Sequence, residues 1–175
     1  MNSSTPGVVI VDLVRGGDLL ETRPDDFGSV LSIGWDRELL PRGWQSFVGP
    51  RHRMLVSDVS VPDRPSTDAT FDAVRAAVQF FPQVVEPLLL HCFAGWSRSP
   101  AVALLYLAWR AGPGREVDAV RQLGEIARTA PNHLIVAAGD VVLGRDGRLF
   151  RALLASDGYD RFTEILALYD WARHQ

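Results

Sequence analysis

The sequence predicts an α/β fold in which a central, mostly parallel sheet of about four or five strands is flanked by helices. Two observations support this prediction. Short apolar, β-branched runs dominate the first half of the chain, and longer segments with helical periodicity dominate the second half. Continuous apolar strands are typical of parallel sheets, because helices cover both faces of such sheets.

Four segments have the length and composition of strands. The first two are β-branched and apolar, and the polar segment 18–26 separates them. The other two lead directly to residues with chemically reactive side chains. The predicted strands are residues 8–14, 29–33, 52–57 and 87–92.

Five later segments have helical periodicity. Gly112-Pro113-Gly114 separates two of them cleanly, since glycine and proline end helices. The predicted helices are residues 68–81, 98–111, 116–130, 132–143 and 161–173.

Length and composition indicate a single cytoplasmic domain, residues 1–175, without repeats or linkers. The net charge of −3 argues against nucleic acid as a partner. One cysteine excludes an internal disulfide, and no targeting segment or apolar run of ~18 residues indicates a membrane partner. Nothing in the sequence indicates the oligomeric state.

Residues 91–100, His-Cys-Phe-Ala-Gly-Trp-Ser-Arg-Ser-Pro, are the most informative part of the chain. They place Cys92 after a predicted strand and Arg98 at the start of a predicted helix, with Gly95 between. Loop N–H groups and a helix N-terminus bind anions, and an arginine fork matches two phosphate oxygens. A thiol in such a setting has a pKa of roughly 3.5–7.5 instead of about 8.5. The pattern predicts phosphoryl transfer to Cys92, although a lone cysteine is more often a buried apolar side chain.

The motif His-Cys-x-x-Gly-x-x-Arg-Ser resembles the signature of the cysteine-based protein tyrosine phosphatases. The compact chain is similar to small bacterial phosphatases of the dual-specificity branch, and the resemblance covers roughly residues 29–149. The resemblance implies a phosphotyrosine protein phosphatase-like fold. The glycine-rich loop of nucleotide-binding P-loop proteins is absent.

The resemblance implies a role for each matching residue. Cys92 is expected to attack phosphorus, while Arg98 and the loop amides hold the phosphate oxygens. Ser99 is expected to donate its hydroxyl to the sulfur, or to cap the helix that follows. His91 is expected to orient the loop through hydrogen bonds, or to be an ordinary buried histidine. The residues expected to bind substrate are Phe93, Ala94, Gly95, Trp96, Ser97 and Arg98.

Such enzymes also need a carboxylic acid that protonates the leaving oxygen. The family usually carries it some thirty residues before the cysteine, and Asp58 and Asp63 lie 34 and 29 residues before Cys92. Asp58 is the preferred candidate, because it follows the carboxyl end of a predicted strand. Asp63 is the alternative, and either aspartate is also compatible with an ordinary loop residue.

Two further segments carry open alternatives. Pro131-Asn132 resembles an element of dual-specificity phosphatases, in which Asn132 hydrogen-bonds near the site, but asparagine here is also a usual helix N-cap. The family often has Gly-Phe where this chain has Leu134-Ile135. The segment 35–44 is compatible with a substrate-recognition loop or with a surface loop anchored by its two tryptophans.

The expected substrate is a phosphorylated protein or a small phosphomonoester, with phosphotyrosine preferred over phosphoserine and phosphothreonine. No lysine lies in the loop, which favours a monophosphate, and Trp96 is suited to stacking on an aromatic ring. Arginines outside the loop supply another source of positive charge, so an inositol phosphate remains an alternative substrate. The alternative functions are a rhodanese-like sulfurtransferase and a catalytically silent phosphate-binding module. No cofactor or metal is expected, because the remaining histidines lack ligand-like spacing. The arginines that can supply such charge are Arg51, Arg53 and Arg64. The histidines without ligand-like spacing are His52, His133 and His174.

Overall fold

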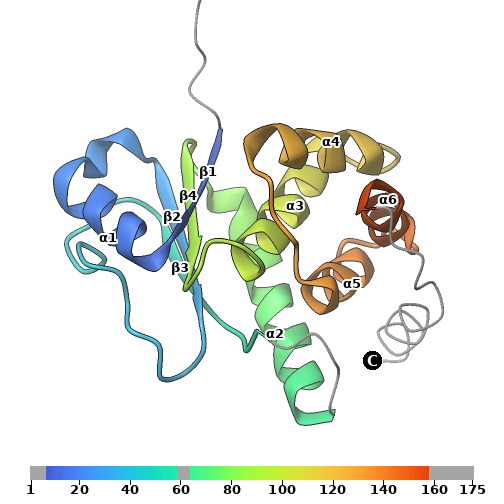
Figure 1. The fold of residues 1–175 in the computed structure, drawn as a ribbon, viewed down its shortest axis with the longest axis horizontal. Helices are drawn as coiled ribbons and strands as arrows, with labels where there is room; N and C mark the ends of the chain where they lie inside the picture. Colours follow the sequence, from blue (N-terminus) through green and yellow to red (C-terminus); the bar gives the residue numbers. More distant parts are fainter. Residues whose placement is uncertain (1–6, 59–63, 158–175) are drawn as a thin grey trace, which may run out of the picture.

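The structure is a computed structural model that describes residues 7–58 and 64–157, without the side chains of residues 64–69. Its centre is a sheet of four strands in the order β1-β4-β2-β3. All pairs in it are parallel, as the sequence predicts. Figure 1 shows the sheet between α1 on one side and the remaining helices on the other. The strands are β1 (Val8–Asp12), β2 (Ser29–Gly34), β3 (Arg51–Leu55) and β4 (Leu88–Cys92).

The described residues form six α-helices and two short 3-10 turns, residues 24–26 and 81–83. Helices α2 and α3 pack on the sheet, and α5 packs on both of them. No helix in the described part of the chain is long and apolar enough to cross a membrane. The helices are α1 (Leu13–Thr22), α2 (Arg64–Phe80), α3 (Arg98–Ala111), α4 (Glu116–Ile126), α5 (His133–Val142) and α6 (Arg148–Asp157).

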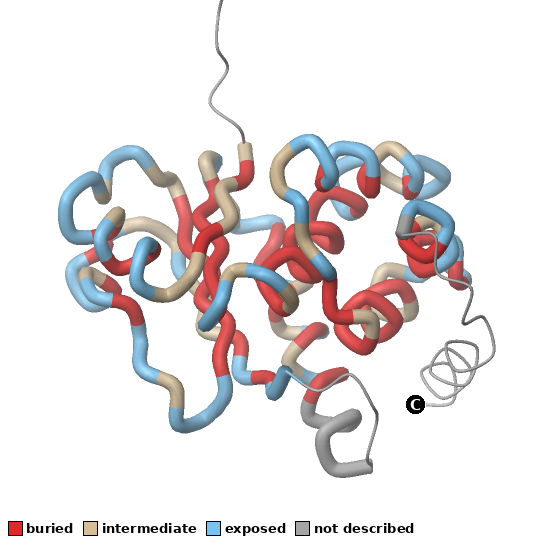
Figure 2. Tube along the Cα trace, in the orientation of Figure 1, coloured by how far each residue is buried: buried red, intermediate tan, exposed pale blue. Residues whose placement is uncertain are grey.

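Two hydrophobic cores lie on the two faces of the sheet. The larger core joins the sheet to the helices on the α3 side, and α3 is buried from Arg98 to Ala108 (Figure 2). The smaller core lies under α1 and contains Leu20, Trp44 and Phe47. Every residue of β2 and β4 is buried. Burial on both faces explains why these strands are continuous apolar runs.

Helix α1 corrects the prediction of a strand over residues 8–14 and a polar connection over 18–26. The strand ends at Asp12, whose carboxylate accepts a hydrogen bond from the backbone N–H of Arg15 at 2.9 Å and caps α1. Gly16 and Gly17 oppose helix formation by local preference. Both allow close approach: a Cβ on Gly17 would lie 3.0 Å from the backbone nitrogen of Arg42.

Other predicted boundaries also change. Helix α4 ends at Ile126 rather than at residue 130, and α2 begins at Arg64 and ends at Phe80 rather than spanning 68–81. Helix α6 was not predicted at all. Its first turn is held by Asp140 of α5, whose carboxylate accepts hydrogen bonds from the backbone N–H groups of Gly147 and Phe150 at 2.5 and 3.0 Å. The predicted helix over residues 161–173 lies outside the described residues.

Candidate active site

The loop between β4 and α3, residues 93–97, is called here the cysteine loop. It joins Cys92, the last residue of β4, to Arg98, the first residue of α3. Gly95 has a φ of +68°, and a Cβ there would lie 2.6 Å from the carbonyl carbon of Val11. Glycine therefore lets the loop pass over the end of β1 without backbone strain. Strand, loop and helix N-terminus follow one another as the sequence predicts, an arrangement that suits anion binding.

The thiol of Cys92 lies at the base of this loop with only 1% of the residue exposed. The hydroxyl of Ser99 donates a hydrogen bond to Cys92 Sγ at 3.2 Å. Of the two roles considered for Ser99, the geometry matches the hydrogen bond to sulfur, because Ser97 rather than Ser99 occupies the N-cap position.

Arg98 is also buried, with 3% of the residue exposed. Its Nη1 and Nη2 donate to the two carboxylate oxygens of Glu38 at 3.2 and 3.0 Å, and Nη1 also donates to the carbonyl of Val56 at 3.3 Å. A buried guanidinium needs such a partner, because an unpaired buried charge is costly. The bidentate pair holds the plane of the guanidinium in one orientation.

The Nε atom of Arg98 makes no hydrogen bond with any residue in the described part of the chain. The nearest acid to it is Asp58, whose Oδ2 lies 3.6 Å away. The Nε–H of Arg98 thus has no hydrogen-bond acceptor among the described residues and is paired with Asp58 by charge alone.

Glu38 was not predicted as a site residue. It belongs to the segment 35–44, which follows the carboxyl end of β2, and that position was the only signal in the sequence. Of the two tryptophans expected to anchor the segment, Trp44 is buried at 8% exposure and Trp35 is 46% exposed, while Glu38 reaches Arg98. Arg42, near its end, forms ion pairs with Asp18 and Glu21 of α1.

Asp58 lies just beyond the end of β3 and reaches the cysteine loop. Its Oδ1 accepts hydrogen bonds from the hydroxyl of Ser97 at 2.8 Å and from Nδ2 of Asn132 at 3.0 Å. Its side chain is 42% exposed, so the carboxyl group lies at the mouth of the site. Asp63, the alternative acid, lies outside the described residues.

Asn132 fulfils both of the roles considered for it. Its Oδ1 accepts a hydrogen bond from the backbone N–H of Ile135 at 3.1 Å and caps α5, while its Nδ2 contacts Asp58.

The backbone N–H groups of Ala130 and Asn132 donate to the carbonyls of Trp96 and Ser97, both at 3.1 Å. The connection from α4 to α5 therefore runs beside the cysteine loop (Figure 1). These bonds also explain why α4 stops at Ile126.

His91 is fully buried behind the loop, where its ring lies against Gly16 of α1. Burial, and then the positive charge of Arg53, lowers its pKa to about 4, so the ring is neutral near pH 7. Neither ring nitrogen has a hydrogen-bond partner among the described residues. Of the two roles considered for His91, the structure shows the buried side chain packed against α1.

The outer side chains of the cysteine loop form an apolar rim. Phe93 is 64% and Trp96 55% exposed. The arginines considered as extra phosphate ligands have partners elsewhere: Arg51 donates to the carbonyl of Phe47 and lies over the ring of Trp44, and Arg53 donates to Ser32 and to the backbone of Glu38. Burial lowers the pKa of Arg53. The side chain of Arg64 is not described.

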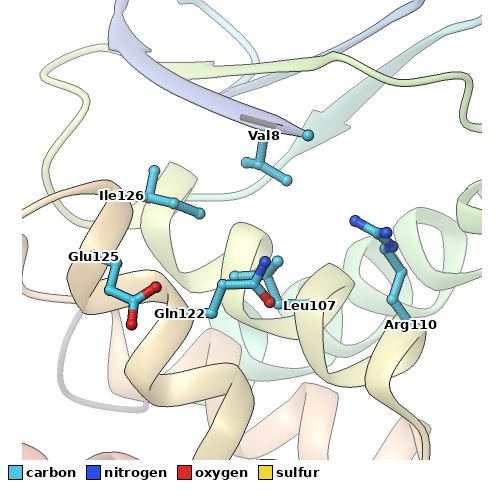
Figure 3. Close-up of a pocket in the computed structure, with 7 residues that line it drawn as sticks. Val8, Leu107, Arg110, Gln122, Glu125 and Ile126 are labelled. Carbon is cyan, nitrogen blue, oxygen red and sulfur yellow. The ribbon is translucent and has the colours of Figure 1, made fainter. Parts of the chain in front are cut away.

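Other parts of the described structure do not contribute to this site. The hollow in Figure 3, of about 360 Å³, is lined by Val8 at the amino end of β1 and by residues of α3 and α4, including Arg110. Cys92 lies at the opposite, carboxyl end of the parallel sheet. No group of three histidine, cysteine, aspartate or glutamate side chains in residues 7–58 and 64–157 is arranged to hold a metal.

Comparisons with known proteins agree with this architecture. No protein-family model matches the sequence, and no curated protein matches it. Among solved structures, the Yvh1 phosphatase domain from Chaetomium thermophilum has a TM-score of 0.53 at 16% identity, with 84% of this chain and 96% of that chain covered. A leucine-rich-repeat and phosphatase-domain protein from Entamoeba histolytica has a TM-score of 0.51 at 12% identity, covering 89% and 93%.

A third match, Tk-PTP in its active form, has a TM-score of 0.50 at 19% identity, with 77% of this chain and 86% of that chain covered. This chain therefore has the fold of the phosphatase domains in these three structures. The fold class predicted from the sequence is confirmed.

Proposed function

We propose that the protein is a metal-independent phosphomonoester hydrolase that acts through a phosphocysteine intermediate. The observation that carries this proposal is the arrangement around Cys92. Its sulfur accepts a hydrogen bond from Ser99, the buried guanidinium of Arg98 is held in one orientation by Glu38, and Nε of Arg98 lies 3.6 Å from the carboxylate of Asp58. A nucleophile, an oxyanion site and an acid are the three groups that this reaction needs.

In the first step, the phosphate of the substrate enters the cysteine loop and its oxygens bind the loop N–H groups and Nε of Arg98. The Cys92 thiolate attacks phosphorus, so that an S–P bond forms while the P–O bond to the leaving group breaks. Protonated Asp58 gives its proton to the leaving oxygen, which departs as an alcohol or phenol. Ser97 and Asn132, which both contact Oδ1 of Asp58, orient the carboxyl group for this transfer.

In the second step, the Asp58 carboxylate takes a proton from water, and the water oxygen attacks phosphorus. The S–P bond breaks, inorganic phosphate forms and the thiolate is regenerated. The hydroxyl of Ser99, 3.2 Å from the sulfur, stabilises the departing thiolate. No proton or electron is gained or lost over the cycle other than those of the water consumed.

The substrate class that the site favours is phosphotyrosine in proteins, with phosphoserine and phosphothreonine as further substrates. Exposed Phe93 and Trp96 at the rim suit an aromatic leaving group. The guanidinium groups of Arg51 and Arg53 are already bound to other residues, Arg51 to Phe47 and Arg53 to Ser32 and the backbone of Glu38, which does not favour a ligand with several phosphates such as an inositol polyphosphate. We place this activity in the cytoplasm.

The first test measures hydrolysis of an aryl phosphate by wild type and Cys92→Ser with a metal chelator present. Wild type is expected to turn over, and Cys92→Ser is expected to lose turnover while it still binds a phosphate ester, because the backbone and Arg98 are unchanged. Turnover by Cys92→Ser at the wild-type rate would refute the proposal. Binding without turnover by the wild type would support the silent binding module, and sulfur transfer from thiosulfate to cyanide would support the sulfurtransferase.

The acid is tested with substrates that differ in their leaving group. Asp58→Asn is expected to slow alkyl and phenyl phosphates by about 10²–10⁴-fold, and activated nitrophenyl phosphates much less, because only poor leaving groups need the proton. Asp63→Asn serves as the matched control. If Asp63→Asn gives this leaving-group dependence and Asp58→Asn does not, Asp63 is the acid.

A further inference from the structure

A groove of about 660 Å³ begins at the cysteine loop, and we call it the Trp96 groove. Trp96 forms its inner end, while α4, the connection that follows α4 and the end of α6 form its walls. Its volume lies within the range of ligand sites. Because the carbonyl of Trp96 accepts a hydrogen bond from Ala130, the groove and the cysteine loop are held together by the backbone.

The groove combines an apolar floor with cationic edges. Val117 is 72% exposed, and Val120 and Ala152 line the same surface. Arg121 and Arg128 also line it, and among its described lining residues none is acidic. Arg128 forms no ion pair with any described residue, and Arg121 has only exposed pairs, at 3.4 Å with Asp118 and 3.5 Å with Glu125. Such exposed pairs exchange easily for other acids.

Gly124 provides an independent observation. It lies inside α4 and lines the groove, and a Cβ built on it would meet no atom within 4 Å. Glycine is among the least favourable residues in a helix interior, and no close contact within the described structure requires it at this position. Its effect is to keep the groove deep beside Trp96.

We propose that the Trp96 groove binds the polypeptide of a phosphoprotein substrate next to the phosphorylated residue. An apolar side chain of the substrate contacts Val117 and Val120, and an acidic side chain pairs with Arg128. This inference rests on the proposed function and narrows its substrate class to phosphoproteins with apolar and acidic residues near the phosphorylated site. An extended chain spans ~3.3–3.6 Å per residue, so a segment of a few residues reaches from the cysteine loop along the groove.

The test uses the full chain and three substrates: a nitrophenyl phosphate, a phosphotyrosine peptide with leucine and aspartate on both sides of the phosphotyrosine, and the same peptide with serine at those positions. Gly124→Trp places a large side chain in the groove, and the protein is expected to fold because a Cβ at this position meets no atom within 4 Å and helix preference rises. It is expected to lower kcat/KM for the leucine and aspartate peptide by about tenfold or more. Gly124→Ala is the matched control, and both variants are expected to keep the wild-type kcat/KM for nitrophenyl phosphate.

Charge is tested separately with Arg128→Glu, which is expected to lower kcat/KM for the acidic peptide and to raise it for a peptide with arginine in place of aspartate. If wild type does not distinguish the peptides, or if Gly124→Trp leaves their kcat/KM values unchanged, the inference fails while the proposed function stands. If residues 158–175 of the chain itself occupy the groove, Gly124→Trp lowers the Tm without changing peptide selectivity, and the inference also fails. Loss of cysteine-dependent nitrophenyl phosphate hydrolysis in the wild type would instead refute the proposed function.

Discussion

His91, directly before Cys92, makes the stability of the protein depend on pH in a way that can be measured. Burial, and then the charge of Arg53, lowers its pKa from 6.5 to about 4 in the folded protein. At about 1.4 kcal/mol per pKa unit, this lowering corresponds to about 3 kcal/mol of stability. A domain whose total stability is about 5–15 kcal/mol is sensitive to a change of that size.

The direction of this pH dependence follows from the number of protons that His91 binds in the folded and unfolded states. Between pH 6.5 and about 4, the unfolded chain carries a proton on His91 that the folded protein does not. Acidification through this window therefore favours unfolding. The contribution is complete above pH 6.5, and it is lost as the pH falls through the folded pKa of about 4.

The assay is urea unfolding of wild type and His91→Gln at several values between about pH 4 and about pH 7. The other carboxylates and histidines titrate in both proteins, so their effects cancel in the difference between the two curves. From pH 7 to pH 4, the free energy of unfolding of the wild type is expected to fall by about 3 kcal/mol more than that of the variant. Parallel curves for the two proteins would refute the argument that His91 is held neutral by burial.

Three further predictions concern residues of the candidate active site. Ser99→Ala is expected to slow breakdown of the phosphoenzyme about tenfold, measured as a larger burst of product before a slower steady state, because the sulfur loses its donor; an unchanged burst would contradict the role of Ser99. Gly95→Ala is expected to lower the free energy of unfolding by about 1–3 kcal/mol, measured in urea, because φ is +68° and the Cβ meets Val11; wild-type stability would contradict it. Glu38→Gln is expected to lower the free energy of unfolding by about 1.5–3 kcal/mol and to reduce kcat/KM, since buried Arg98 loses its charged partner; a variant as stable and active as wild type would show that the pair does not hold the guanidinium.

The parts of the fold and site that the sequence predicted are the local ones. β2 and β4 were found because buried parallel strands are short, apolar and continuous, whereas β3 was also predicted although only Met54 in it is buried. The cysteine loop was found because residues 91–100 carry nucleophile, glycine and arginine within one stretch of chain. Asp58 lies beside the cysteine loop, as its position after the carboxyl end of a predicted strand indicated.

The parts that escaped prediction depend on contacts between distant residues. Helix α1 contains Gly16 and Gly17, which local preference disfavours and which only the packing of His91 and Arg42 explains. Helix α6 is capped by Asp140, whose carboxylate accepts hydrogen bonds from backbone N–H groups seven and ten residues further along the chain. Glu38 reaches Arg98 across 60 residues of sequence, so no local pattern identifies it.

The sheet order has a consequence for how the chain reaches its native state. β4 pairs with β1 on one side and with β2 on the other, while β1 and β2 do not pair with each other. During synthesis, the first two strands cannot join one sheet until residues 88–92 have left the ribosome, and long-range parallel pairing of this kind is slow. The strand that ends in Cys92 thus also completes the sheet. A substitution that weakens β4, such as Leu89→Ala, is expected to slow folding and to reduce the amount of assembled active site together.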